Sequence, residues 1–424
     1  MTPDWFDSGF PHIWQPYAQA KTAPLPLPVA RTEGCRIILQ SGEALIDGIS
    51  SWWCTPHGHN HPHLVKAAKA QLDIMPNVMF AGLAHEPAYR LAARLIDIAP
   101  RTPSVSLERV FFSDSGSTSV EVALKIALQY WSNQGNNDKT RFACLKYGYH
   151  GDTFGAMGVS DPARGMHKAY HPNVVEALAL DVPQSTDDYN AFDHALDRHK
   201  KELAALIVEP LVQGAGGMRF YPAQSLHFMQ ECCKRHNIVF IVDEIMTGFG
   251  RTGDMFACDT AEVVPDILCI GKGLTGGIMT LAATLTQAHI YDAFYNDDVM
   301  KALMHGPTFM ANPLACAVAN ASLDLYENEP RLQQVAHIEQ HFKATLPALL
   351  EHPYVQDVRI KGAIGVVQID TDHINPFDLR PQCVKYGVWL RPYSNIIYIT
   401  PPFTVSEKEL KKLTDAVKNL LYSC

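Results

Sequence analysis

One lysine and one aspartate follow apolar runs at positions where side chains can do chemistry. Lys272 comes directly after "DILCIG", and Asp243 ends the run "NIVFIVD". Such runs are typical of buried strands, and α/β sheets gather ligands at the carboxyl ends of their strands. A partly desolvated lysine amine loses its proton readily and attacks carbonyl carbons. Taken alone, each residue also has a purely structural explanation: Lys272 as a solvated side chain, and Asp243 as a helix cap.

A third segment, "FFSDSGSTSVEVALKIALQYW", changes from an apparent strand through a Gly/Ser-rich turn into a long helix. The free N–H groups and the positive dipole end of a helix start suit a phosphate group. Thr118 and Glu121 also have capping-box spacing, which would make the turn a helix cap and nothing more. Together, a phosphate turn, a strand-end aspartate to face a ring nitrogen and a strand-end lysine are what pyridoxal phosphate chemistry needs.

The elements that must position these residues alternate along the middle of the chain. Apolar runs predict strands at 109–113, 141–146, 203–210, 237–244 and 266–271, and helices are predicted at 87–99, 117–131 and 224–236. Runs without polar alternation indicate strands covered by helices on both faces of a mostly parallel sheet. The sequence therefore predicts a large, doubly wound α/β domain.

The pattern of hydrophobic and polar residues changes after about residue 311. A predicted helix near 330–350 is followed by short apolar segments such as "IGVVQID" and "IIYIT". These segments predict a smaller α+β domain. We expect residues 61–310 to form the large domain and 311–424 the small one. Residues 1–60 are expected to be an N-terminal segment that belongs to the small domain.

Charge and composition exclude several classes of function. The formal net charge of −9 and the lack of a long Lys/Arg run make nucleic acid an unfavourable partner. The ten cysteines include no C-x-x-C pair, which favours a reducing cytoplasm. No stretch approaches the roughly 20 apolar residues of a membrane span, and the N-terminus lacks an export signal.

Longer motifs give a more specific indication. "IVDEIMTGFGRTGDMFACDTAEVVPDILCIGKGLTGG" and "YGYHGDTFGAM" resemble the signature of the class III, fold type I, pyridoxal-phosphate-dependent aminotransferases. The resemblance implies that Lys272 binds the cofactor covalently and moves protons, and that Asp243 faces the ring nitrogen. The other cofactor-binding residues that it implies are Gly116 and Ser117 at the phosphate, Tyr149 over the ring, Glu209 in a supporting role, and Pro307 and Thr308.

In this family the last two residues reach the phosphate of the neighbouring subunit. The resemblance therefore implies a homodimer with shared active sites.

Further stretches, including "HIWQPY", "DGISSWWCTPHGHNHP" and "GVWLRPYSNIIYITPP", resemble one branch of the family along nearly the whole chain. That branch moves an amino group from S-adenosylmethionine, or in some relatives lysine, to 8-amino-7-oxononanoate in biotin biosynthesis. The resemblance implies that Trp52 walls the aliphatic chain of the acceptor and that Arg391 grips its carboxylate. The other substrate-binding residues that it implies are Tyr17, Tyr149, Lys272, Gly306 and Tyr398.

The same region carries histidines at 57, 59, 61 and 63. They lie in a Gly/Pro-punctuated turn, where alternate spacing does not place side chains on one face as it does in a strand. We therefore expect no metal site, and we expect Trp53 to be the core member of the tryptophan pair. Two alternatives stay open: another class III aminotransferase, of the ornithine or 4-aminobutyrate type, and a metal-binding or regulatory module built on these histidines.

Overall fold

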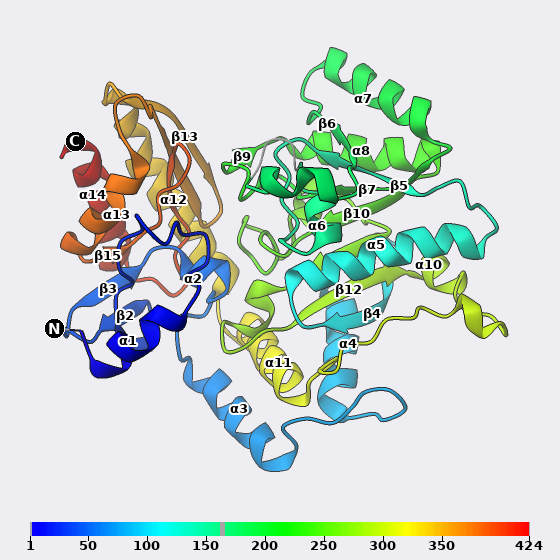
Figure 1. The fold of residues 1–424 in the computed structure, drawn as a ribbon, viewed down its shortest axis with the longest axis horizontal. Helices are drawn as coiled ribbons and strands as arrows, with labels where there is room; N and C mark the ends of the chain where they lie inside the picture. The colour runs from blue at the N-terminus through cyan, green and yellow to red at the C-terminus, as the bar shows by residue number, and fades with distance from the viewer. Residues whose placement is uncertain (1, 162–165, 424) are drawn as a thin grey trace.

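The computed structural model describes residues 2–161 and 166–423. One body is built around a large sheet with helices on both of its faces, and the other combines the two ends of the chain (Figure 1). In the second body, the N-terminal strands lie beside C-terminal strands and helices, which are drawn in blue and in orange to red.

The large sheet has seven strands in the order β4-β12-β11-β10-β7-β5-β6. All neighbours in the run from β11 to β6 are parallel, whereas β12 is antiparallel to both β11 and β4. The strands are β4 (Leu107–Ser113), β5 (Arg141–Leu145), β6 (Leu178–Leu180), β7 (Leu203–Val208), β10 (Val239–Asp243), β11 (Ile267–Ile270) and β12 (Ala282–Gln287).

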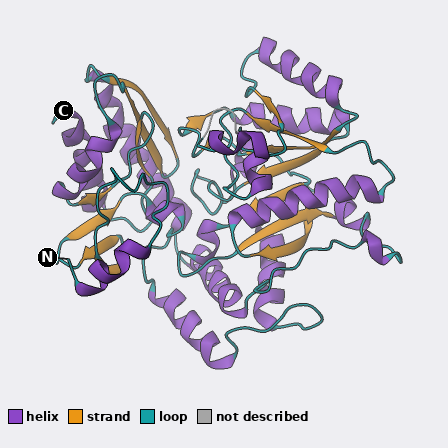
Figure 2. Ribbon diagram, in the orientation of Figure 1, coloured by secondary structure: helices purple, strands orange, loops and turns teal. Residues whose placement is uncertain are grey.

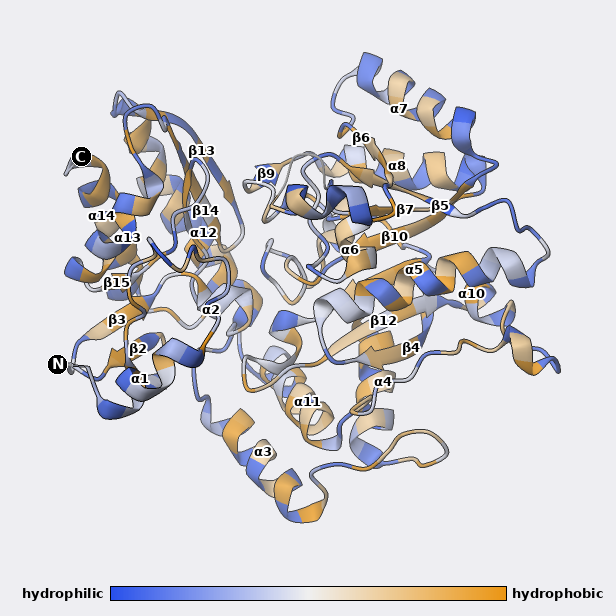
Figure 3. Ribbon diagram, viewed as in Figure 1, coloured by the Kyte–Doolittle hydropathy of each residue, from blue (hydrophilic) through white to orange (hydrophobic). Residues whose placement is uncertain are grey.

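The inner strands are buried on both faces. Every residue of β7, β10 and β11 is buried, and successive residues alternate between two core clusters, with Ile241 in one and Val242 in the other. Helix α5 (Gly116–Asn133) covers the first face, while α4 (Glu86–Ile98) and α8 (Ala223–His236) pack on the second. The central strands are accordingly hydrophobic along their length (Figure 3).

The second body contains two smaller sheets. Strands β1 (Val29–Glu33), β2 (Arg36–Leu39) and β3 (Ala44–Asp47) form one sheet with β15 (Val388–Trp389), which runs parallel to β3. Strands β13 (Val355–Lys361), β14 (Ile364–Ile369) and β16 (Ile396–Ile399) form the other. Helices accompany both sheets, as the colouring by element type makes clear (Figure 2).

The remaining helices connect or cover these sheets. They are α1 (Asp4–Gly9), α2 (Ser50–Trp53), α3 (Pro62–Ile74), α6 (Phe154–Gly158), α7 (Thr186–His199), α9 (Ala257–Ala261), α10 (Ala288–Asp292), α11 (Pro313–Asn328), α12 (Arg331–Thr345), α13 (Pro376–Lys385) and α14 (Glu407–Tyr422). A short hairpin joins β8 (Val212–Gln213) to β9 (Arg219–Phe220).

The doubly wound, mostly parallel sheet predicted from the sequence is confirmed. The sequence did not reveal β12, whose segment "AATLTQ" mixes small and polar residues although all but its last residue are buried. None of the helices that the structure describes is long and apolar enough to cross a membrane.

Candidate active site

Asp243 and Lys272 meet because their strands are neighbours. β10 and β11 are parallel, and Asp243 lies opposite Cys269, so both residues come at the same edge of the sheet. There they line a cleft of about 160 Å³. The cleft is also bordered by Ser115 to Ser117, Glu209 and Trp53. The structure thus brings together the lysine, the aspartate and the glycine-containing turn that the sequence singled out.

The carboxylate of Asp243 is buried and held in one orientation. Its Oδ1 accepts a hydrogen bond from the backbone N–H of Ile245 at 3.0 Å, and its Oδ2 lies 2.8 Å from Nδ1 of His150. The Nε2 atom of His150 is buried and has no hydrogen-bond partner among the residues that the structure describes. A fixed anion at the floor of a cleft can stabilise a protonated ring nitrogen placed against it.

The amine of Lys272 is poised as a nucleophile. No hydrogen bond or ion pair of its Nζ occurs within residues 2–161 and 166–423. The Nζ atom lies 4.8 Å from the centroid of the Trp53 ring. Burial lowers the pKa of Lys272, although the negative charges of Asp243 and Glu209 partly oppose this shift. A lowered pKa raises the fraction of neutral amine at a given pH.

The glycine-containing turn opens helix α5. Ser115 is the N-cap, and its Oγ accepts a hydrogen bond from the N–H of Thr118. The capping-box interpretation of Thr118 and Glu121 is therefore wrong, because Glu121 instead accepts hydrogen bonds from the N–H groups of Gly155 and Ala156. Any Cβ on Gly116 would lie 3.0 Å from Ile245, so the lack of a side chain keeps the helix start open to the cleft.

These features fit pyridoxal phosphate. The N–H groups at the start of an 18-residue helix can hold the phosphate, the buried Asp243 can face the ring nitrogen, and Lys272 can reach the aldehyde. Ile245 lines the same cleft and supplies an apolar surface beside Asp243.

Glu209 lines the cleft and binds backbone groups of two neighbouring segments. Its two carboxylate oxygens accept hydrogen bonds from the backbone N–H groups of Tyr149, at 2.9 Å, and Gly214, at 2.8 Å. Burial raises the pKa of Glu209 to about 7. The side chain therefore ties the loop that carries Tyr149 to the turn between β8 and β9 and helps to set the position of the tyrosine.

Tyr149 belongs to a polar cluster that sequence reasoning missed in part. Its hydroxyl donates to Asp152 at 3.0 Å, the hydroxyl of Tyr17 donates to the same carboxylate, and Nε2 of His167 lies 2.9 Å away from it. The hydrogen bond from His167 is the main reason that the pKa of Asp152 is lowered. The spacing "YHGD" could have indicated this aspartate, since residues 149 and 152 share one loop.

The tryptophan pair lies in an unusual backbone turn. Residues Ser50, Ser51, Trp52 and Trp53 all have positive φ, from 44° to 68°, and form one turn of left-handed helix. Each non-glycine residue in this conformation costs roughly 1–2 kcal/mol, so side-chain contacts must offset several kcal/mol here. The turn directs Trp53 to Lys272 and Trp52 to Arg391.

Trp53 is therefore only partly the core residue that the sequence predicts. It packs against the hydrophobic core and lies 6.1 Å from the buried Tyr398, centroid to centroid. It also lines the Lys272 cleft, which the sequence did not reveal.

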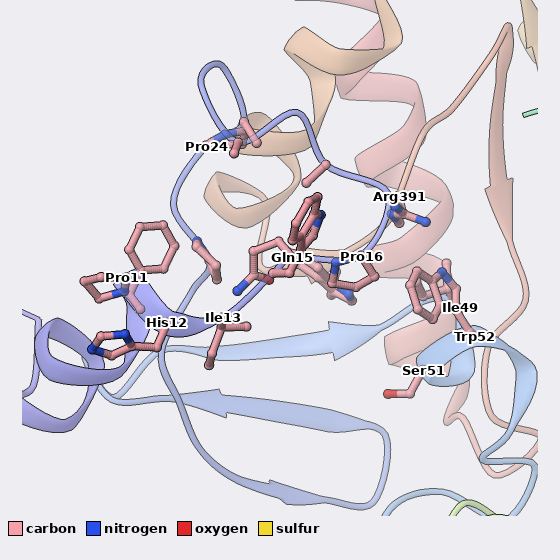
Figure 4. Close-up of a pocket in the computed structure, with 17 residues that line it drawn as sticks. Pro11, His12, Ile13, Gln15, Pro16, Pro24, Ile49, Ser51, Trp52 and Arg391 are labelled. Atoms are coloured by element: carbon pink, nitrogen blue, oxygen red, sulfur yellow. The ribbon is translucent and has the colours of Figure 1, made fainter. Parts of the chain in front are cut away.

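Arg391 and Trp52 form a second part of the site. The guanidinium carbon lies 4.7 Å from the centroid of the Trp52 ring, and the ring of Tyr17 meets Trp52 edge-on at 5.8 Å. No carboxylate of the described residues forms an ion pair with Arg391. The pair also borders a groove of about 770 Å³, whose other wall is the N-terminal segment 10–26 (Figure 4).

Residues 306–308 lie apart from this chain's own cleft. Gly306 and Thr308 are exposed, Pro307 is half-buried, and none of the three lines the cavity around Lys272. The geometry within one chain thus does not bring them to the helix start at Gly116.

The histidines at 57, 59, 61 and 63 do not form one cluster, although the rings of His57 and His61 meet edge-on at 6.4 Å. Each ring contacts a different set of side chains, and the described ranges contain no group of three or more His, Cys, Asp or Glu residues placed to hold a metal ion. In order, their partners are Ser322 with Arg331, Asp47, Glu329, and Asp324.

Comparison with known proteins adds to this geometry. The model of the aminotransferase class-III family matches residues 17–421. The adenosylmethionine-8-amino-7-oxononanoate aminotransferase of Buchnera aphidicola subsp. Acyrthosiphon pisum is 44% identical over 419 residues, which cover 97% of this chain and 96% of that protein. The protein of the same name from Mycobacterium leprae is 45% identical over 419 residues, covering 96% and 94%.

Solved structures agree in fold. The adenosylmethionine-8-amino-7-oxononanoate aminotransferase of Methanocaldococcus jannaschii superposes with a TM-score of 0.93 at 33% identity, covering 99% of this chain and 98% of that one. An amine transaminase from an uncultivated Pseudomonas species, in its PLP-bound (internal aldimine) form, gives a TM-score of 0.88 at 32% identity, covering 97% and 99%.

Proposed function

Because the chain belongs to the class III aminotransferase family, we propose that it transfers the amino group of S-adenosylmethionine to 8-amino-7-oxononanoate, the step of biotin biosynthesis that yields 7,8-diaminononanoate. The single observation that carries the choice of acceptor is the placement of Arg391, whose guanidinium has no carboxylate partner in the described part of the chain, over the ring of Trp52. An indole beside a free guanidinium suits a long aliphatic acid, whose chain needs an apolar wall and whose end needs a cation.

The residues around the cleft divide the work on the cofactor. Bound pyridoxal phosphate supplies the electron sink that stabilises the carbanion left when a substrate loses its α-proton. Lys272 would bind the cofactor, and its neutral amine would take up and return the α-proton of the substrate. Asp243, oriented by His150 and Ile245, would face the ring nitrogen, while Gly116 and Ser117 would hold the phosphate.

Substrates are held by residues from distant parts of the chain. Trp52 and Tyr17 wall the acceptor chain, and Arg391 binds its carboxylate through two parallel hydrogen bonds. Tyr149 covers the cofactor ring and completes the pocket with the buried Tyr398, while Gly306 borders the pocket of the neighbouring subunit.

The working enzyme is a homodimer in this proposal. Pro307 and Thr308 contact the phosphate of the neighbouring subunit, which accords with their distance from the cleft of their own chain. We place the enzyme in the cytoplasm, with no nucleic-acid partner, and assign residues 61–310 to a large domain and 1–60 with 311–424 to a small one.

Steady-state kinetics test the reaction. Because donor and acceptor must occupy one pocket in turn, ping-pong kinetics are expected. Plots of reciprocal initial rate against reciprocal donor concentration, at several fixed acceptor concentrations, should therefore give parallel lines. Intersecting lines would contradict the shared pocket. Activity with ornithine or 4-aminobutyrate, and none with 8-amino-7-oxononanoate, would replace the proposed substrates by those of another class III enzyme; lysine in place of S-adenosylmethionine would change the donor alone.

The lowered pKa of Lys272 predicts a pH dependence of cofactor capture. The neutral amine is the nucleophile, so the rate at which apoenzyme binds pyridoxal phosphate covalently should rise with pH and level off below the ordinary lysine pKa of 10.5. Stopped-flow absorbance of the cofactor measures this rate. A rate that keeps rising through the ordinary pKa would mean that Lys272 is an unperturbed lysine.

A further inference from the structure

The left-handed turn Ser50–Trp53 needs support that its own residues do not provide. Serine and tryptophan have no intrinsic preference for positive φ, unlike glycine. The turn nevertheless closes its backbone hydrogen bonds, from the N–H of Trp53 to the carbonyl of Ile49 at 3.0 Å and from that of Cys54 to Ser50 at 2.9 Å. Contacts from outside the turn must therefore make this backbone the favoured one.

Asp47, the last residue of β3, provides two of those contacts, while Arg251 and Thr400 bind the hydroxyl of Ser50. The side chain of Asp47 is fully buried, its Oδ1 accepts the N–H of Ile49 at 3.1 Å, and its Oδ2 accepts the hydroxyl of Ser51 at 2.9 Å. Nε2 of His59 lies 2.9 Å from the same Oδ2. A single carboxylate thus binds the residue before the turn and a residue inside it, while His59 fixes the carboxylate.

The position of Asp47 links the turn to Arg391. β3 and β15 are parallel, and Asp47 lies opposite Trp389, two residues before Arg391. The segments that follow β3 and β15 leave the sheet side by side, which brings Arg391 to the face of Trp52. Whether Trp52 meets Arg391 therefore depends on the backbone path directly after Asp47.

We propose that Asp47, held by His59, is a positioning residue for the acceptor site. It stabilises the left-handed turn that directs Trp53 to Lys272 and Trp52 to Arg391. Asp47 does not line the Lys272 cleft, so its effect reaches the substrate only through the turn. The inference rests on the proposed function, because it assigns the Trp52–Arg391 pair to the acceptor.

Substitutions at Ser51 separate backbone control from a loss of general packing. Alanine and glycine both remove the hydroxyl that Asp47 binds, but only glycine adopts positive φ without a steric penalty. Ser51→Ala should raise the KM for the acceptor several-fold and leave kcat nearly unchanged. Ser51→Gly should stay closer to the wild type.

The two Ser51 substitutions are then each combined with Asp47→Ala. Asp47→Ala alone should raise the acceptor KM by at least about tenfold, since small displacements of positioning groups have effects of this size. Asp47→Ala with Ser51→Gly should recover part of the loss, whereas Asp47→Ala with Ser51→Ala should not. Asp266→Ala is a matched control, because Asp266 also accepts a backbone N–H, from Phe240, and has a histidine neighbour, but it directly precedes β11, at the end of the strand opposite Lys272.

Each outcome decides the inference. Equal KM values for Ser51→Ala and Ser51→Gly, in either background, would overturn it, and the single variants answer the question even if Asp47→Ala does not fold. Near-UV circular dichroism of the tryptophans provides a readout without substrate: the alanine variants should change it and Ser51→Gly should not. If the wild type fails to aminate 8-amino-7-oxononanoate, the proposed function fails, and the dichroism comparison still tests the role of Asp47.

Discussion

Replacing Lys272 by alanine should leave the fold intact and reduce turnover by at least about 10⁴-fold, because the variant loses both the covalent attachment of the cofactor and the proton carrier. The fold should survive because Nζ makes no hydrogen bond or ion pair with the described residues, and its burial opposes its charge. Circular dichroism, the yellow absorbance of the bound cofactor and a single-turnover assay measure the three effects. Normal turnover by the variant would remove Lys272 from the reaction.

Lys139→Ala is a control for the loss of a buried lysine, because Lys139, unlike Lys272, has hydrogen-bond partners among the described residues. Its Nζ is also buried, but it donates to the carbonyls of Lys200, Leu203 and Asn237, far from the cleft. Lys139→Ala should therefore lower the free energy of unfolding, since buried carbonyls lose their partner. It should still bind the cofactor covalently. Only the loss at Lys272 is expected to separate activity from stability.

Arg391→Ala should chiefly weaken binding of the acceptor. Leaving a desolvated carboxylate without its partner costs about 2–5 kcal/mol, which is roughly a 30-fold to several-thousandfold rise in KM. Arg391→Lys should lie between the wild type and alanine, because an ammonium keeps the charge but loses the two parallel hydrogen bonds. Initial rates at varied acceptor concentration measure the effect.

The methyl ester of the acceptor is a sharper probe of the same contact. The wild type should bind the ester much more weakly than the acid, whereas Arg391→Ala should bind both alike. An unchanged KM in Arg391→Ala, or equal discrimination by both enzymes, would mean that the carboxylate is bound elsewhere.

The chemical centre could be predicted because it depends on local features. Asp243 and Lys272 each follow an apolar strand, and strand ends in a parallel sheet meet at one edge. The turn before α5 was recognisable for the same reason, since a strand, a glycine-containing turn and a helix are consecutive in the chain.

The contacts that orient this centre could not be predicted, because they join residues that are distant in the sequence. His150 reaches Asp243, and Tyr17 reaches Asp152, only after the strands are paired and the N-terminal segment is placed. Periodicity carries no information on such pairs. The strand β12 was missed because most of its buried residues are small or hydroxyl-bearing, and Thr284 finds its partner in Ser119 of α5.

The left-handed turn was hidden for another reason. Its residues favour other conformations locally, so tertiary contacts from Asp47, Arg251 and Thr400 override local preference there. A conflict of this kind between sequence and backbone is expected at a functional site. It is consistent with the place of Trp52 and Trp53 beside Arg391 and Lys272.

The central claim is that one lysine at the edge of the buried sheet holds the cofactor. Reducing the holoenzyme with borohydride fixes the bond between cofactor and amine, and mass spectrometry of the digested protein locates it. The account predicts a pyridoxyl phosphate group on the peptide that contains Lys272 and on no other. Its presence on a different lysine, or on none, would contradict the account.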